Sequence, residues 1–404
     1  MTDWKNHASA DMMRVFGEPQ ALLVRGSGCL VWDENGTEYL DFLGGIAVNV
    51  LGHAHPAMVE AISTQAATLI HISNYFVSPP QLELAARLKR LSGAGEHGRV
   101  YFANSGTEAN EAAFKLARLN TGGGHRTRIL ALNTAFHGRT MGALALTGKP
   151  AIQDDFAPLP GGVEHIDSTI EALEAAMDDS VAALFVEPIK GEAGVIELPD
   201  GYLARARELT AQHGALLILD EVQTGNGRTG EWFAFQREGI VPDAITLAKG
   251  MGGGFPIGAL VTFGAASDLF TPGKHGSTFS GNPLATATAN AVLGEIEDAG
   301  LVDNARVRGE QLRELVLGIG SPLITEVRGT GLLLGIGLSE PVANELVSAA
   351  LDAGLIINAP NPHTIRLAPP LIIGDDEVQL FDERFRAALA ALSTPAGSPN
   401  EGIQ

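Results

Sequence analysis

Two short stretches decide the fold of this 404-residue chain, Leu216–Gln223 (LLILDEVQ) and Thr246–Gly254 (TLAKGMGGG). Each begins as an apolar run and ends in a charged side chain, Asp220 in the first and Lys249 in the second, and glycines follow the lysine at once. Such runs are typical of buried parallel strands, which would carry both charges to one edge of a sheet. A buried charge without a partner is costly, so the pattern predicts a group that satisfies both.

Pyridoxal phosphate (PLP) is a cofactor that satisfies both charges. A lysine forms a Schiff base with its aldehyde, and an aspartate beside the pyridine nitrogen keeps that nitrogen protonated, so that the ring accepts electrons. The alternative is the magnesium-holding strand of an ATPase, which also ends in Asp-Glu but requires a Gly-x4-Gly-Lys-Ser/Thr phosphate loop. The nearest match, 142–150, has five residues between its glycines and a proline in place of the hydroxyl. This spacing argues against an ATPase.

Composition narrows the class of protein further. Hydrophobic residues make up 45% of the chain, which is long enough for two or three domains. The 27 basic and 47 acidic residues give a net charge of −20, which argues against nucleic acid or an anionic membrane as a partner. The single cysteine, Cys29, excludes an internal disulfide and a cysteine-rich metal site, and no metal is expected. No apolar run approaches the roughly 18 residues of a membrane span, and no signal peptide is evident, so a cytoplasmic location is expected.

The pattern of predicted helices and strands changes twice along the chain. Asn35-Gly36, between alternating runs, predicts a hairpin in a meander over 21–42. Helical stretches at 81–91 and 107–119 then alternate with apolar strands, which predicts an α/β fold with a mostly parallel sheet. The strands of this region are predicted at 99–103, 128–132, 182–186, 215–219, 244–247 and 258–263. From about residue 300 a smaller α+β unit is expected, with helices at 302–318, 341–353 and 376–392 and strands at 322–327, 331–337, 355–358 and 364–367.

These changes predict four parts. Residues 1–50 form an N-terminal arm, loose or helical, and a meander that packs with the small domain. Residues 51–300 form the large domain, and 301–393 form the small C-terminal domain. The tail, 394–404, is rich in proline, glycine and serine and is expected to be disordered.

Ligands of an open parallel sheet bind beyond the carboxyl ends of its strands, and a first motif is predicted to lie there. Asn104–Glu111 (NSGTEANE) would open a helix at Ser105, Gly106 and Thr107, whose backbone N–H groups suit a phosphate. The same residues also fit a capping box, with Ser105 as the cap and Glu108 three positions later. The two interpretations are compatible.

Two more motifs follow predicted strands. Asn133–Thr140 (NTAFHGRT) contains Phe136, which could stack on a flat ring, and Arg139, which could hold a carboxylate. Without further context, a core phenylalanine and a solvent-exposed arginine are the favoured interpretation. Gly276–Pro283 (GSTFSGNP) is a loop rich in hydroxyls, or an ordinary turn. Arg366 lies within an apolar run and therefore needs an anion, either a substrate carboxylate or a structural partner.

Together these motifs resemble the class III aminotransferases, PLP enzymes of fold type I. The resemblance covers about residues 20–392. Within the class the sequence is most similar to the acetylornithine aminotransferase group, on Leu43–His53 (LGGIAVNVLGH) and on Gly276–Phe279. One small departure is Ala193, where the family often has glycine or serine. The motifs that carry the resemblance are Phe102–Glu111, Phe136–Arg139, Leu219–Gly225, Ala248–Gly254 and Gly276–Pro283.

The resemblance implies a large domain built on a mostly parallel sheet, a smaller α+β domain, and a role for each site residue. Lys249 carries PLP and shuttles a proton, and Asp220 pairs with the pyridinium. The other cofactor-binding residues are implied to be Ser105, Gly106, Thr107, Phe136, Val222, Gln223 and, from the neighbouring subunit, Thr278.

The substrate-binding roles are implied in the same way. Arg139 and Ser277 would contact N-acetylornithine, and Arg366 would take the α-carboxylate of glutamate. N-acetylornithine reacts through its terminal amine, which has no carboxylate beside it, so Arg366 would then lose its partner. Glu192 is expected to pair with Arg366 in that case and to swing away for glutamate. The alternative for Glu192 is an exposed loop residue.

The implied protein is a homodimeric aminotransferase of arginine biosynthesis with shared active sites. It would move the terminal amino group of N-acetylornithine to 2-oxoglutarate, giving N-acetylglutamate semialdehyde and glutamate. The rivals are aminotransferases of ornithine, γ-aminobutyrate or succinyldiaminopimelate, and a PLP aminomutase, which would need no 2-oxoglutarate. A non-enzymatic PLP-binding regulator would carry a DNA-binding segment, for which residues 1–20 are too few.

Overall fold

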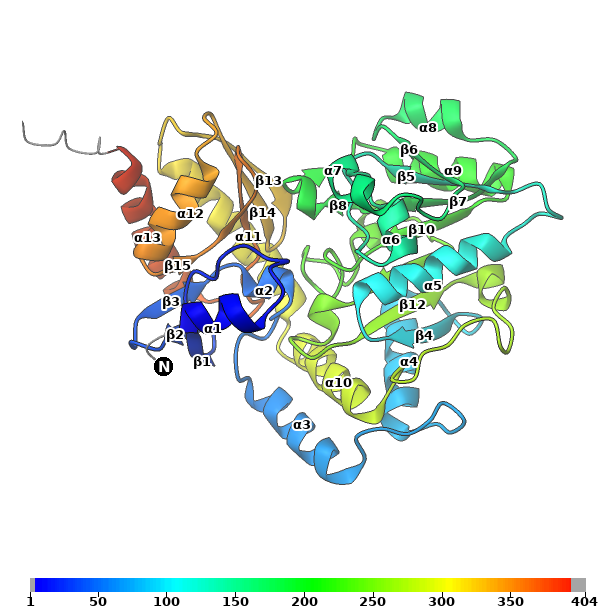
Figure 1. The fold of residues 1–404 in the computed structure, drawn as a ribbon, viewed down its shortest axis with the longest axis horizontal. Helices are drawn as coiled ribbons and strands as arrows, with labels where there is room; N and C mark the ends of the chain where they lie inside the picture. Colours follow the sequence, from blue (N-terminus) through cyan, green and yellow to red (C-terminus); the bar gives the residue numbers. More distant parts are fainter. Residues whose placement is uncertain (1–3, 394–404) are drawn as a thin grey trace, which may run out of the picture.

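A seven-stranded sheet forms the centre of the larger lobe (Figure 1). The computed structural model describes residues 4–393, and the strand order is β4-β12-β11-β10-β7-β5-β6. Strand β12 is antiparallel to both neighbours, and the other four pairs are parallel. The mostly parallel sheet predicted from the sequence is therefore confirmed. The strands are β4 (Arg99–Ala103), β5 (Arg128–Leu132), β6 (Val163–Ile166), β7 (Val181–Val186), β10 (Leu216–Asp220), β11 (Ala244–Leu247) and β12 (Gly258–Thr262).

The central strands are apolar throughout because both faces of the sheet are covered. All five residues of β10 are buried. Leu217 and Leu219 belong to one hydrophobic cluster, and Leu216 and Ile218 belong to another on the opposite face. Alternate side chains of one strand thus enter two separate cores, which a continuous apolar run allows and an alternating pattern does not.

Helices cover both faces of the large sheet (Figure 1). Helix α5 packs against β12 and β11, and α9 packs against β10 and β7. The predicted helices 81–91 and 107–119 correspond to α4 and α5. The helices of this region are α3 (Pro56–Thr68), α4 (Pro79–Ser92), α5 (Gly106–Leu119), α6 (Met141–Leu146), α7 (Pro150–Gln153), α8 (Ile170–Ala176), α9 (Tyr202–His213) and α10 (Pro283–Asp298).

The smaller lobe contains two four-stranded sheets. One has the order β13-β14-β17-β16, and the other, β1-β2-β3-β15, joins the N-terminal meander to the C-terminal part of the chain. Helices α11 (Leu301–Gly318), α12 (Ala343–Asp352) and α13 (Asp375–Ser393) complete it, and α2 (Gly44–Ala47) follows the meander. The strands are β1 (Leu23–Ser27), β2 (Leu30–Asp33), β3 (Glu38–Asp41), β13 (Ile324–Thr330), β14 (Leu333–Leu338), β15 (Leu355–Ile356), β16 (Asn358–Asn361) and β17 (Thr364–Leu367).

The single strand predicted at 355–358 is wrong. Leu355 and Ile356 pair with β3, whereas Asn358 begins β16, which pairs with β17 in the other sheet. The chain changes sheets within one residue, and an apolar run does not reveal which sheet each residue joins. The hairpin at Asn35-Gly36 is present between antiparallel β2 and β3, with Gly36 at φ 84°.

The N-terminal arm is helical in α1 (Trp4–Asp11), and residues 1–3 lie outside the described part of the chain. The predicted disordered tail, 394–404, also lies outside it. The domain boundaries at 50 and 300 stay a prediction. Across residues 4–393, no helix is both long and apolar enough to cross a membrane.

Candidate active site

A cavity of about 400 Å³ lies beyond the carboxyl ends of β4, β5, β7, β10 and β11. The loops that leave these strands line it, together with Val48 from the N-terminal segment and Phe255–Ile257 ahead of β12. Of the sequence-predicted site residues, ten line this cavity. They are Ser105, Gly106, Thr107, Phe136, Arg139, Glu192, Asp220, Val222, Gln223 and Lys249.

Asp220 is held at the floor of the cavity by three donors. Its Oδ2 accepts hydrogen bonds from Asn110 Nδ2 at 2.7 Å and from His137 Nδ1 at 2.8 Å, and its Oδ1 accepts one from the backbone N–H of Val222 at 3.0 Å. Thr246 in turn donates to Asn110 Oδ1 at 2.8 Å. The side chain of Asp220 is only 4% exposed. A buried carboxylate in such a network is both paired and fixed in direction.

His137 has the electrostatic character that a paired imidazole should have. Burial alone would lower its pKa, but the hydrogen bond and charge of Asp220 outweigh burial, and the pKa is raised. Glu187 also lines the cavity, where its Oε1 accepts from the N–H of Phe136 at 2.7 Å. Burial raises the pKa of Glu187 to about 7.

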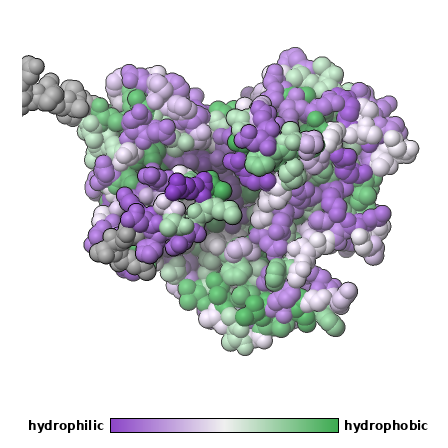
Figure 2. All heavy atoms as spheres, viewed as in Figure 1, coloured by the Kyte–Doolittle hydropathy of each residue, from purple (hydrophilic) through white to green (hydrophobic). Residues whose placement is uncertain are grey.

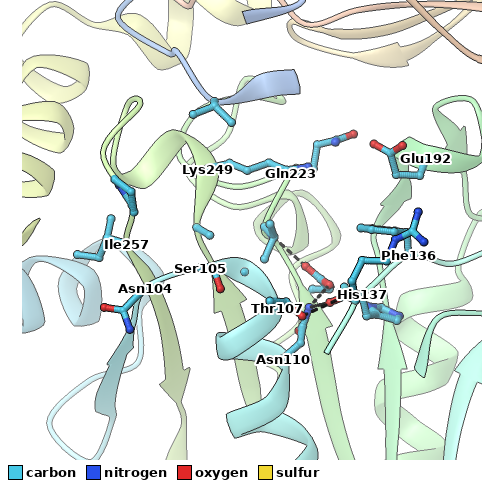
Figure 3. A pocket seen from close by; sticks show the side chains of 18 of the residues that line it. Asn104, Ser105, Thr107, Asn110, Phe136, His137, Glu192, Gln223, Lys249 and Ile257 are labelled. Atoms are coloured by element: carbon cyan, nitrogen blue, oxygen red, sulfur yellow. Dashed lines mark hydrogen bonds and ion pairs between the residues drawn. The ribbon is translucent and has the colours of Figure 1, made fainter. Parts of the chain in front are cut away.

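Lys249 faces Asn110 and His137 across the cavity (Figure 3). No hydrogen bond or ion pair reaches its Nζ from any described residue. Burial lowers its pKa, which favours the neutral, nucleophilic amine. Its backbone is in the left-handed region at φ 43°, a strained conformation for a non-glycine residue. The fold therefore holds a strained backbone at the residue whose amine lies in the cavity.

The N-terminus of α5 forms another wall. Ser105 caps the helix, and its Oγ accepts from the N–H of Glu108 at 3.2 Å. The predicted capping box is only half present, because Glu108 Oε2 accepts a hydrogen bond from the N–H of Asn104 at 2.8 Å rather than from that of Ser105. The first N–H groups of a helix have no intrahelical partner, so this end suits a phosphate. A Cβ on Gly106 would lie 2.8 Å from Val222, which explains the glycine.

Phe136 and Arg139 stand together on the side of the cavity next to α5. The guanidinium of Arg139 is exposed and lies 5.7 Å from the ring centroid of Phe136. The backbone N–H of Arg139 donates to Thr107 Oγ1 at 3.2 Å. Of the two interpretations of this motif, the cavity wall fits its position better than a core phenylalanine does.

Arg366 is 1% exposed and contacts two residues that line the cavity, Glu192 and Gln223. Its Nη1 donates to Glu192 Oε1 at 2.5 Å and lies 3.5 Å from Gln223 Oε1, and its Nε donates to Asn358 Oδ1 at 3.2 Å. Its Nη2 is buried without a hydrogen-bond partner. Burial opposes ionisation of Glu192, but Arg366 outweighs it, so the pKa of Glu192 is lowered. Glu192 is thus not an isolated loop residue.

Ser277 and Thr278 do not line the cavity of this chain. Ser277 Oγ accepts from Asn104 Nδ2 at 3.2 Å, next to the cavity. Thr278 is exposed, and so is the neighbouring Phe279. Asn74 holds this loop through the carbonyls of Ser277 and Ser280, at 3.4 and 3.0 Å.

Several residues that the fold brings to the site have no role predicted from the sequence. His137 stood inside the Phe136–Arg139 motif, and Asn110 stood in the Asn104–Glu111 motif. Their position in those motifs was the available signal, but contact with Asp220 required the tertiary structure. Glu187 and Lys149 carried no such signal.

Residues 14–389 match the family model for aminotransferase class-III. The chain belongs to the class III aminotransferases. An acetylornithine aminotransferase of Streptomyces coelicolor is 55% identical over 92% of this chain and 91% of its own length. An ornithine aminotransferase of Toxoplasma gondii is similar in structure, with a TM-score of 0.92 at 33% identity over 97% and 96% of the two chains. An N-acetylornithine aminotransferase of Stenotrophomonas maltophilia has a TM-score of 0.83 at 36% identity over 96% and 99%.

PLP is the cofactor of this family, and the residues of the cavity fit it. The unpartnered amine of Lys249, the fixed carboxylate of Asp220 and the N-terminus of α5 lie in one cavity. These are the three groups that an aldehyde, a pyridinium and a phosphate require. No cluster of three or more potential metal ligands occurs within residues 4–393.

Proposed function

We propose that this aminotransferase transfers the terminal amino group of N-acetylornithine to 2-oxoglutarate, as a step of arginine biosynthesis. The products would be N-acetylglutamate semialdehyde and glutamate. The substrate assignment is supported by relatives that are called acetylornithine aminotransferases and are 50–55% identical over most of this chain.

PLP, when bound, supplies an electron sink for the negative charge that develops on the substrate carbon bearing the amine. We propose that Lys249 holds the cofactor through Nζ and, when released by substrate, moves a proton at that carbon. Asp220, fixed by Asn110 and His137, would keep a proton on the pyridine nitrogen. Ser105, Gly106 and Thr107 would hold the phosphate, Phe136 and Val222 would pack on the two faces of the ring, and Gln223 would lie near its phenolic oxygen.

The observation that carries the proposal is the pairing of Arg366 with Glu192 at 2.5 Å. Glutamate presents a carboxylate beside its reacting amine, and N-acetylornithine does not. An unpaired buried charge costs about 3–5 kcal/mol, so one site serves both substrates only if Arg366 has an internal anion to fall back on. Glu192 would supply that anion for N-acetylornithine and leave it for glutamate. The free Nη2 of Arg366 offers glutamate a further donor.

We propose a homodimer in which each cavity is completed by the partner. Large apolar side chains are exposed over α3, the segment that follows it and the start of α4, and a hydrophobic surface is visible at the bottom of the view in Figure 2. An apolar surface of this kind marks a protein interface. Asn74, within that segment, binds the loop that carries Thr278. Thr278 would then reach the partner's phosphate, while Ser277 and Arg139 would contact N-acetylornithine. The exposed residues are Val59, Leu69, Ile70, Tyr75, Phe76, Val77 and Leu82.

A half-reaction panel tests the substrate assignment. The holoenzyme is mixed with N-acetylornithine, ornithine, γ-aminobutyrate or N-succinyldiaminopimelate, and the absorbance change of the bound cofactor gives kcat/KM for each amine. N-acetylornithine should give the highest value, and product formation should require 2-oxoglutarate. A higher value for another amine would replace the assigned substrate, and turnover of an amino aldehyde without 2-oxoglutarate would indicate an aminomutase. We propose a cytoplasmic location for the enzyme, which fractionation of cells would test.

A further inference from the structure

Three consecutive backbone carbonyls next to the cavity are held by side chains from distant parts of the chain. Lys149 Nζ donates to the carbonyl of Glu192 at 2.8 Å, and Asn361 Nδ2 donates to that of Ala193 at 3.1 Å. Arg328 Nε donates to the carbonyl of Gly194 at 2.9 Å. A loop normally leaves its carbonyls to solvent, so three directed donors in succession fix the path of this loop.

The donors come from both lobes. Asn361 and Arg328 belong to β16 and β13 of the small lobe, whereas Lys149 lies between α6 and α7 of the large lobe. The backbone beside Lys149 is anchored in turn, because Gly148 exchanges hydrogen bonds with Thr134 and Ala135, just ahead of Phe136. The loop of Glu192 is thus fastened to each lobe.

The local backbone fits this close approach. Gly194 has φ 113°, and a Cβ there would lie 2.5 Å from Asn361 Nδ2 and 3.2 Å from Arg328 Nη2. Val195 has φ 57°, a conformation that β-branched residues avoid. The loop therefore keeps an unfavourable shape that its donors stabilise.

Lys149 differs from the other two donors because its charge lies close to the residues proposed to bind substrate. The ammonium interacts electrostatically with Glu192, Glu187, Arg366 and Arg139. Burial lowers its pKa, and the two carboxylates oppose that effect. Its stem is half-buried, so neither the position nor the charge of this lysine is that of a free surface residue.

We infer that Lys149, with Asn361 and Arg328, clamps the backbone of the Glu192 loop so that only the side chain of Glu192 moves between substrates. Lys149 is then a positioning residue that sets the balance between the two half-reactions. This inference rests on the proposed exchange at Arg366. Without the clamp, Glu192 would pair less well with Arg366, which would disfavour an amine without a neighbouring carboxylate and favour a dicarboxylate.

The test uses the holoenzyme with Lys149→Met, which keeps the length of the side chain and removes the donor and the charge. The ratio of kcat/KM for N-acetylornithine to that for glutamate should fall about fivefold. Isothermal titration with glutarate, a dicarboxylate without an amine, should show binding tighter by a similar factor. Damage to the fold weakens both ligands, so a gain in glutarate binding identifies the clamp.

Two further variants make the outcome decisive. Lys89→Met removes a comparable lysine–carbonyl bond, to Glu96 at 3.2 Å, away from the cavity and should leave both readouts unchanged. Asn361→Ala should shift both readouts in the same direction as Lys149→Met. An unchanged ratio and glutarate affinity in Lys149→Met, or parallel losses in both, would overturn the inference. If Glu192→Gln also leaves the ratio unchanged, the exchange itself is wrong; if Glu192→Gln shifts it and Lys149→Met does not, the clamp alone is wrong.

Discussion

Arg366 Nη1 and Glu192 Oε1 form a 2.5 Å ion pair between β17 of the small lobe and the segment that follows β7 of the large lobe. The arginine is buried, whereas the glutamate is 28% exposed. The two side chains therefore differ in their freedom to move: the arginine is fixed by its burial, whereas the glutamate can move into the cavity that it lines. An anionic substrate competes with Glu192 for one fixed cation.

Glu192→Gln should lower kcat/KM for N-acetylornithine about tenfold more than for glutamate, a difference of about 1.4 kcal/mol. The amide can still accept from Arg366 but cannot neutralise it, so the cation is left without an anion when N-acetylornithine binds. Single-turnover measurements of both half-reactions give the ratio, in which general damage cancels. A ratio that is unchanged, or that shifts toward N-acetylornithine, would rule out the exchange.

Lys249 should be the residue that carries the cofactor, because its amine alone reaches the cavity with a lowered pKa and no described partner. The purified protein should be yellow, and borohydride should fix the cofactor to Lys249. Peptide mapping by mass spectrometry locates the label. Attachment to another lysine, such as the half-buried Lys149 or the buried Lys190, would contradict the assignment.

Asp220→Asn should retain cofactor but lose turnover by at least about a hundredfold, or about 2.7 kcal/mol of barrier. A neutral amide cannot hold a proton on the pyridine nitrogen. It also replaces one acceptor oxygen by an NH₂ group, which conflicts with the N–H of Val222 in one orientation and with Asn110 and His137 in the other. Steady-state kinetics at saturating cofactor checks the result, with exposed Asp179→Asn as the control. Near-normal turnover would count against the pairing.

Shared sites should be visible by complementation. Lys249→Ala and Thr278→Arg chains are each expected to be inactive, the second because Thr278 lies on the exposed loop proposed to reach the partner. A mixed dimer would carry one site with both defects and one with neither. Activity should therefore return, up to about half per mixed dimer, on refolding the two together. Verified mixed dimers as inactive as their parents would show that each chain completes its own site.

The sequence predicts the placement of Asp220 and Lys249 well because local pattern determines it. An apolar run that ends in a charge must deliver that charge to a sheet edge, and β10 and β11 do so. The helix that opens at Ser105 follows from its cap for the same reason. The structure brings these residues into one cavity.

Other features depend on contacts that no local pattern encodes. His137 meets Asp220 from 83 positions away, and Asn110 meets it from 110. Lys149 lies in the 142–150 segment, which only partly matches a phosphate loop, and its amine donates to the carbonyl of Glu192, 43 residues later. The change of sheet between Ile356 and Asn358 likewise depends on tertiary contacts, because Ile356 pairs with β3 and Asn358 pairs with β17.

The stability of the protein should depend on pH through Glu221, which is fully buried beside the site but outside the cavity. Its Oε1 accepts from the N–H of Phe235 at 2.9 Å, and its Oε2 accepts from the hydroxyl of Thr224. Burial, with the nearby charge of Asp220, raises its pKa from 4.5 to about 7, although these hydrogen bonds oppose the rise. Between those values the folded protein keeps a proton that the unfolded chain releases, so stability falls as the pH rises. The loss is absent below about pH 4.5 and reaches about 3 kcal/mol above pH 7.

Glu221→Gln removes this titration, keeps the acceptor for Phe235 and lets Thr224 accept instead of donate. Relative to the unsubstituted protein, the variant should therefore gain stability from pH 5 to pH 8. Melting temperatures of the cofactor-free proteins at equal concentration, with exposed Glu340→Gln as the control, measure the change. Among the described residues, Glu187 is the other buried carboxylic acid with a raised pKa; it is present in every protein compared, so its contribution cancels. A difference in melting temperature that is the same at both pH values would mean that Glu221 is ionised in the fold throughout.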